Sequence, residues 1–161
     1  ALLLLMICAR IQVGYWENAK TLFRHAITAT DENFLAHNNL GAALARDGKL
    51  TEAIAHYHKA LQLRPRYADA FFNLGAALAG TGKFSEAMIY YREALHIKPN
   101  FKEVYNNMCI AFVFQGNMRE AIRCFRKALM IRPDYIAAQN NLNLALKEAG
   151  KLQENILKHE R

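Results

Sequence analysis

Apolar residues recur along the chain with a helical spacing. Ala53, Tyr57 and Ala60 stand at positions i, i+4 and i+7, which lie on one face of a helix. Leu40 and Leu44, in the stretch before them, are also four residues apart. This spacing predicts two successive helices rather than strands.

Glycine and proline divide this pattern into units. Gly48 lies between the two apolar stretches, which indicates a helix end and a short turn. Pro65 follows the second stretch and ends it. Thr51 and Ser85, each followed by Glu, are the expected starts of the second helices. Each unit is therefore predicted to form two antiparallel helices, A and B.

The whole pattern repeats every 34 residues. The recurring positions are the prolines (Pro65, Pro99, Pro133), the glycines (Gly48, Gly82, Gly116, Gly150), the small residues of helix B (Ala53, Ala87, Ala121 and Ala60, Ala94, Ala128) and its aromatic residue (Tyr57, Tyr91, Phe125). Small residues let two helix backbones approach, and the aromatic ring fills the space beside them. One hairpin cannot bury its apolar face, so stacked copies are expected to share a core and curve into a superhelix.

The period of 34, with Leu-Gly followed by Ala, an aromatic residue, Ala and Pro, resembles the tetratricopeptide repeat (TPR). The resemblance covers nearly the whole chain and implies an all-α fold, a right-handed α-solenoid of stacked antiparallel helix pairs. We expect a single array over residues 1–161, made of a divergent repeat (1–33), full repeats (34–67, 68–101 and 102–135) and a partial repeat or cap (136–161). Asn155 stands where the last helix-B alanine belongs.

In TPR proteins helix A lines a concave groove that binds peptides, and the matching positions here are implied groove residues. They are Asn38, Asn39, Arg46, Phe72, Asn73, Asn106, Asn107, Ile110, Phe114, Asn140, Asn141 and Lys147. The resemblance implies a non-catalytic protein–protein interaction scaffold whose partner is a protein or an extended peptide.

One row of amides recurs at the 34-residue step, at Asn39, Asn73, Asn107 and Asn141. An amide carries donors and an acceptor, so such a row can pair with the backbone of an extended peptide of any sequence. The row is similar to the asparagine ladder in the repeat arm of the O-linked N-acetylglucosamine transferases. The alternative is that each Asn bonds the neighbouring repeat's backbone and only stiffens the stack.

The other groove residues indicate which class of peptide the groove binds. Phe72, Ile110 and Phe114 suit apolar side chains of a peptide, or pack between adjacent A helices. Arg46 and Lys147 are far apart in sequence, so they match poorly the basic clamp with which some TPR proteins hold a C-terminal carboxylate.

The formal charge of +7 and the pI of about 9.5 favour acidic partners in general. Most Lys and Arg residues fall on B helices or near the prolines, where a solvated convex face is expected. No groove-reading motif or RNA module is present, so we do not expect nucleic acid to bind.

We also expect no enzyme activity, cofactor, metal or small-molecule substrate. The stretch 80–83, Gly-Thr-Gly-Lys, lacks the spacing of a phosphate loop. His37 occupies a helix-packing position, and His56 and His58 are too close in sequence to share a helix face. The three cysteines are too few and scattered for a disulfide framework, and a redox pair of Cys109 and Cys124 is not expected.

The N-terminus differs from the rest, because residues 1–9 form an unbroken apolar run. A bilayer requires about 20 residues, so the run is expected to be the end of a membrane helix in a longer protein, or a surface that docks on another protein or on itself. Between residues 12 and 41, Gly14-Tyr15-Trp16, Asn18 and Asn33 through Gly41 resemble the junction in the transmembrane and TPR family related to protein O-mannosyltransferases.

That second resemblance implies an alternative function, the substrate-recruiting arm of a multi-pass membrane glycosyltransferase that is O-mannosyltransferase-like or O-GlcNAc-transferase-like. The protein would then be membrane-associated through residues 1–9, and otherwise cytoplasmic. The side of the membrane stays open, because long domains translocate largely regardless of their charge.

Overall fold

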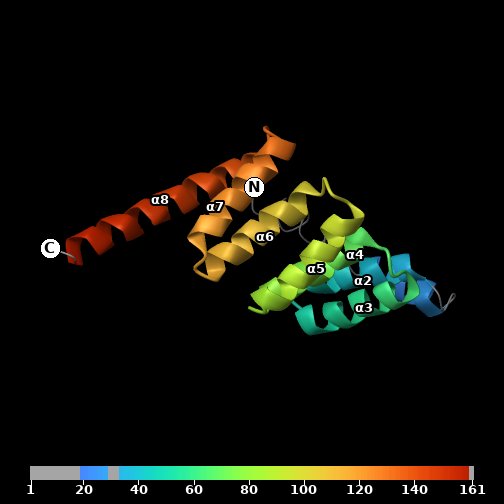
Figure 1. Cartoon of the computed structure of the whole chain (residues 1–161). Coiled ribbons are helices and arrows are strands. Elements are labelled where there is room, and N and C mark those ends of the chain that lie inside the picture. Colours follow the sequence, from blue (N-terminus) through green and yellow to red (C-terminus); the bar gives the residue numbers. More distant parts are fainter. Residues whose placement is uncertain (1–18, 29–32, 160–161) are drawn as a thin grey trace, which may run out of the picture.

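The chain is an all-α stack of helix hairpins, which confirms the predicted fold class (Figure 1). The computed structural model describes residues 19–28 and 33–159, and the side chains only as far as residue 151. Residues 19–28 are helical. The helices that follow are α2 (Phe34–Arg46), α3 (Leu50–Leu63), α4 (Ala68–Gly80), α5 (Phe84–Ile97), α6 (Lys102–Phe114), α7 (Met118–Ile131) and α8 (Ile136–His159). The pairs α2–α3, α4–α5 and α6–α7 are hairpins of helices A and B.

Each hairpin turns at a glycine with a left-handed backbone. Gly48, Gly82 and Gly116 have φ values of 78°, 82° and 76°. The Gly48 N–H donates to the carbonyl oxygen of Ala45 at 3.1 Å, and the next N–H donates to that of Leu44 at 2.9 Å. These two bonds form a Schellman motif, which satisfies the last carbonyl groups of helix A and requires a residue that tolerates positive φ.

The B helices begin one residue earlier than predicted. The α3 helix begins at Leu50 rather than Thr51, and α5 begins at Phe84 rather than Ser85. Neither helix has a side-chain cap hydrogen bond. The reason is that the glycine turn itself sets the start, since the Leu50 N–H already donates to the Gly48 carbonyl oxygen at 2.9 Å.

The small positions pack against the aromatic ones as expected. A Cβ added to Gly41 would lie 2.7 Å from the Tyr57 ring, and one added to Gly75 would lie 2.6 Å from the Tyr91 ring. Both rings are buried, at 2% and 1% exposure. In the first two hairpins the A helix therefore approaches its B helix closely enough that only a hydrogen fits at this position.

The third repeat departs from this arrangement, and the cysteine prediction was wrong. Cys109 replaces the small glycine on α6, and it forms a disulfide with Cys124 on α7 across a Cα–Cα distance of 5.3 Å. The two residues are 15 apart in sequence. The antiparallel hairpin places these two residues opposite each other where α6 and α7 lie closest together. The sequence spacing alone does not reveal this.

The last helix continues where the earlier A helices stop. Gly150 occupies the place of the turn glycines in sequence, but it lies inside α8 and has no positive φ. The helix therefore extends beyond α7, away from the stack (Figure 1). Within residues 19–28 and 33–159, no helix is long and apolar enough to cross a membrane. The apolar run over 1–9 lies outside the described residues.

Candidate peptide-binding groove

Three pockets lie along the A helices, and we call this surface the A-helix groove. The first, of about 200 Å³, lies between residues 19–28 and α2 and is lined by Ala19, Phe23, Asn39, Ala42, Ala43 and Arg46. The α4–α6 pocket, of about 490 Å³, is lined by Ala76, Ala79, Gly80, Gly82, Phe84, Tyr91, Asn107, Ile110, Ala111 and Phe114. The α6–α8 pocket, of about 440 Å³, is lined by Ile110, Val113, Phe114, Met118, Phe125, Asn141, Leu144, Ala145 and Glu148.

The two larger pockets are neighbours because they share Ile110 and Phe114 of α6. The Phe114 side chain is 67% exposed, and its ring stacks on that of Phe84 at a centroid distance of 5.0 Å. Leu144, on the far wall of the α6–α8 pocket, is 60% exposed. Large apolar side chains held in the open at a concave surface are typical of binding sites.

Among the predicted asparagines, two are buried acceptors and two others are their hydrogen-bond donors. Asn38 and Asn106 are buried, at 5% and 7% exposure. The Oδ1 of Asn38 accepts a hydrogen bond from Asn73 Nδ2 at 3.0 Å, and the Oδ1 of Asn106 accepts one from Asn141 Nδ2 at 3.1 Å. We call these two pairs the amide clasps. They link adjacent repeats through their side chains. The alternative interpretation had expected bonds to the backbone of the neighbouring repeat.

The junction between α4 and α6 has no such clasp. Phe72 stands where the other clasps have Asn, and its ring packs against that of Phe101 at 5.1 Å. Asn107 instead accepts a hydrogen bond from the neighbouring Asn106 Nδ2 at 3.5 Å. Burial raises the pKa of Tyr91 to about 12, and the Asn107 side chain opposes the rise. Phe72 is therefore packing between repeats, while Asn107 lies at the rim of the α4–α6 pocket.

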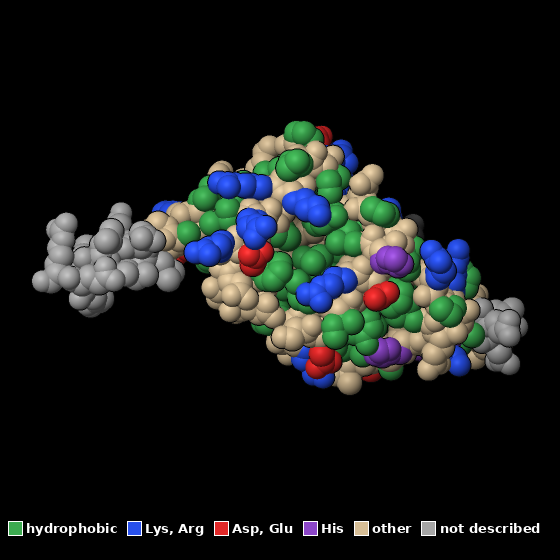
Figure 2. Space-filling view, in the orientation of Figure 1, with side chains coloured by type: hydrophobic (Ala, Val, Ile, Leu, Met, Phe, Trp, Pro, Cys, Tyr) green, Lys and Arg blue, Asp and Glu red, His purple; other side chains and the backbone are tan. Residues whose placement is uncertain are grey.

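The charged groove residues lie apart from one another. Arg46 lines the first pocket on α2, whereas Lys147 is exposed on α8 and lines none of the three. Asn140, also exposed on α8, lines none of them either. Figure 2 shows Lys and Arg side chains distributed over the face in view, with acidic side chains between them. The arrangement does not assemble a carboxylate clamp.

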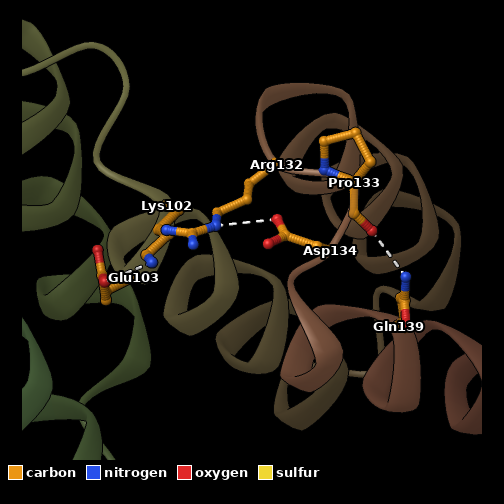
Figure 3. Close-up of polar contacts among 6 residues, drawn as sticks. All are labelled: Lys102, Glu103, Arg132, Pro133, Asp134 and Gln139. Carbon is orange, nitrogen blue, oxygen red and sulfur yellow. Dashed lines mark hydrogen bonds and ion pairs between the residues drawn. The ribbon is translucent and has the colours of Figure 1, made fainter.

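The turn into α8 is fixed by a polar cluster (Figure 3). Arg132 Nε donates to Asp134 Oδ1 at 2.9 Å, and Gln139 Nε2 donates to the Pro133 carbonyl oxygen at 2.7 Å. The Arg132 guanidinium lowers the pKa of the Asp134 carboxyl group. The Gln139 bond joins the first turn of α8 to Pro133 in the connection that follows α7.

Phe84 and Met118 line the larger pockets but were not among the predicted groove residues. Both are the first residues of B helices and close the ends of the larger pockets. A signal was present, because an apolar residue follows the turn at the 34-residue step in Leu50, Phe84 and Met118. Groove positions were expected only on A helices.

Among the residues that the structure describes, no group of three or more His, Cys, Asp or Glu side chains gathers to hold a metal ion. His37 and His56 do face each other across α2 and α3, with 3.0 Å between their Nδ1 atoms. His37 therefore occupies the packing position that was predicted for it, and it is 8% exposed.

Comparisons with known proteins agree with this architecture. A crystal structure of MamA matches with a TM-score of 0.78 and 21% identity, covering 88% of this chain and 83% of that one. The second TPR domain of human RPAP3, in complex with the HSP70 peptide SGPTIEEVD, matches with a TM-score of 0.64 and 21% identity over 68% of this chain and 91% of its own. The first TPR of Spaghetti (RPAP3), bound to the HSP90 peptide SRMEEVD, matches with a TM-score of 0.70 and 21% identity. The match covers 73% of this chain and 96% of that one.

These solved structures show the shared fold. A comparison with curated proteins found no match. Two family models, both described as tetratricopeptide repeat, match residues 32–100 and 103–135, which together make up more than half of the chain. The chain belongs to the tetratricopeptide repeat family.

Proposed function

We propose that this chain is a non-catalytic scaffold whose A-helix groove binds an extended peptide segment of a partner protein. The observation that carries the proposal is the pair of neighbouring apolar pockets on either side of Ile110 and Phe114. TPR domains are typically non-catalytic, and structural neighbours of this chain were solved with bound peptides. The pockets suggest which peptides fit here.

The pockets favour two apolar side chains on one face of the peptide. Neighbouring packed helices are about 10 Å apart, so the α4–α6 and α6–α8 pockets are separated by roughly that distance. An extended chain rises about 3.3 Å per residue, and its side chains alternate between faces. A peptide with bulky apolar residues roughly two or four positions apart therefore fits both pockets.

The amides at the rim can hold the peptide backbone between these side chains. The clasp to Asn106 uses one N–H of the Asn141 side-chain amide. The second N–H and the Oδ1 atom of Asn141 can pair with groups of a peptide backbone. Asn73 has the same arrangement through its bond to Asn38. Because backbone pairing ignores side-chain identity, specificity would come from the pockets.

An acidic C-terminal tail is not the ligand that this groove favours. Such tails need several cations close together, and Arg46 and Lys147 lie on different helices at opposite ends of the described repeats. Glu148 also lines the α6–α8 pocket and would repel a carboxylate. We therefore expect internal apolar segments to bind better than acidic termini.

The test is a selection of random 12-residue peptides displayed on phage, followed by calorimetry with the selected peptides. Phe114→Ala and Leu144→Ala should each weaken binding about tenfold or more, because each removes a pocket wall. Met130→Ala is the matched control, since Met130 is 83% exposed on α7 and lines none of these pockets. Equal losses in all three variants would contradict binding in the groove.

A second experiment examines the amide row. Joint replacement of Asn73 and Asn107 by Ala should reduce affinity for the same peptides, whatever their sequence. Unchanged affinity would assign the row to stiffening of the stack alone. Circular dichroism of the variant is needed alongside, because Asn73 also serves in an amide clasp.

One observation favours a second candidate, the recruiting arm of a membrane glycosyltransferase. The disulfide of Cys109 and Cys124 suits a compartment outside the reducing cytosol, where such bonds persist. Intact mass and membrane partition of the native gene product test this candidate. A much larger product that requires detergent would support it, and a soluble product near 18.3 kDa would overturn it.

A further inference from the structure

We propose that Cys124 is a site of thiol–disulfide exchange with small-molecule or protein disulfides, and that closure of its bond to Cys109 fixes the α6–α8 pocket. The second half of this inference rests on the proposed peptide-binding function, and the first half does not.

The two cysteines differ in access. Cys109 is fully buried on α6, at 0% exposure, while Cys124 is partly exposed on α7. A reagent from solution therefore reaches Cys124 first. Lys127 lies three residues further along α7, on the same helix face, and a nearby cation favours the thiolate that performs the exchange.

The site also accommodates the reduced state. The carbonyl oxygen of Tyr105 lies 2.7 Å from Cys109 Sγ and 3.4 Å from Cys124 Sγ. When the disulfide is open, this oxygen can accept a hydrogen bond from either thiol, so a buried S–H is not left without a partner. Both redox states of the pair therefore fit between α6 and α7.

The exchange balances with one disulfide as the oxidant. The Cys124 thiolate attacks a sulfur of R–S–S–R, which forms a mixed disulfide and releases one R–S⁻. The Cys109 thiolate then attacks the Cys124 sulfur, forms the internal disulfide and releases the second R–S⁻. Two electrons pass from the cysteines to the oxidant, and the two protons lost by the cysteines yield two R–SH. Reduction by a dithiol is the reverse.

The bond is placed where it can act on the groove. Cys109 is followed by Ile110, and Cys124 is followed by Phe125, and both of these neighbours line the α6–α8 pocket. The disulfide therefore fixes two walls of one pocket relative to each other. The equivalent places in the earlier hairpins hold Gly41 and Gly75, which have no covalent link to helix B. Preorganised walls bind more tightly because less is ordered on binding.

Mass spectrometry with glutathione disulfide tests the exchange. In Cys109→Ala the resolving thiol is absent, so a mixed disulfide with glutathione should accumulate at Cys124. In Cys124→Ala the buried Cys109 should remain unmodified over the same time. Peptide mapping separates both from Cys8, the third cysteine. Absence of the adduct at Cys124, or equal modification of Cys109, would overturn the assignment.

Calorimetry with a phage-selected peptide tests the coupling to the groove. Reduced protein should bind about fivefold more weakly than oxidised protein. The double variant Cys109→Ala, Cys124→Ala should bind with the same affinity with and without reductant. Equal affinity of both redox forms of the natural sequence would overturn the coupling. Absence of binding in both forms would overturn the proposed function and the coupling together, and would leave the exchange result standing.

Discussion

The Nδ1 atom of His37 on α2 lies 3.0 Å from the Nδ1 atom of His56 on α3. One nitrogen must donate a proton and the other must accept it, so the pair is satisfied only while at least one ring is neutral. The equivalent pair in the next hairpin is Phe71 and Tyr90, whose rings stack at a centroid distance of 6.3 Å. The first hairpin therefore has two histidines in contact where the second has two aromatic rings.

This pair predicts that stability falls on acidification. Burial is the largest cause that lowers the pKa of both rings below 6.5. The charges of His56 and then Lys59 lower the pKa of His37 further, and Arg24 lowers that of His56, where Glu52 opposes it. The folded protein thus binds fewer protons than the unfolded chain, so the contribution is present above about pH 6.5 and is lost as pH falls through the folded pKa values. Urea unfolding between about pH 7.5 and about pH 5 should show the decline.

The next hairpin supplies the control for this experiment. The double variant His37→Phe, His56→Tyr copies the pair of Phe71 and Tyr90, so its stability should depend less steeply on pH over the same range. The other histidines remain and give the same background in both proteins. Identical slopes in the two proteins would show that the pair does not titrate on unfolding.

Two glycines in helices predict opposite responses to alanine. In Gly75→Ala the new Cβ would lie 2.6 Å from the Tyr91 ring and 3.2 Å from the Ala87 carbonyl oxygen. This overpacking should cost about 1–3 kcal/mol of the free energy of unfolding. In Gly150→Ala nothing lies within 4 Å of the new atom, so the better helix former should add up to about 1 kcal/mol. Urea unfolding of both variants tests the contrast, and a neutral Gly75→Ala would contradict the close approach.

The disulfide predicts a difference in stability that is separate from any ligand. The bond between Cys109 and Cys124 closes a loop of 15 residues, for which chain entropy gives about 3 kcal/mol. Thermal unfolding should occur at a lower temperature with reductant than without it. The double variant Cys109→Ala, Cys124→Ala should show no such response. A reductant effect of equal size in the variant would point to another cause.

The hairpins could be predicted from the sequence because their determinants are local. Gly48 and Pro65 mark the ends of helices through backbone constraints, and Ala53 and Tyr57 mark a packed face by their spacing. Each copy also repeats the information of the others. The fold was therefore recoverable from the 34-residue period without knowledge of any contact.

The groove was only partly predictable, because its side chains depend on contacts between repeats. Asn38 and Asn73 occupy neighbouring sequence registers, and nothing in either repeat alone shows that one amide binds the other. Phe114 was identified as a groove residue, whereas its stacking partner Phe84 was not, since Phe84 begins a B helix. The pairing of Cys109 with Cys124 likewise required the register of α6 against α7.

The amide clasps predict coupling between neighbouring repeats. Asn106 is 7% exposed and accepts from Asn141, so Asn106→Ala should cost about 1 kcal/mol of the free energy of unfolding. Asn141→Ala should lower the free energy of unfolding in two ways. It removes the contacts of Asn141 itself, and it leaves the buried Oδ1 of Asn106 without its hydrogen-bond donor. In a double-mutant cycle the two changes should therefore be non-additive by about 0.5–1.5 kcal/mol. Asn140, exposed on the same helix, provides the control, since Asn140→Ala paired with Asn106→Ala should be additive. Additivity in both cycles would show that the amides of α6 and α8 do not stabilise each other.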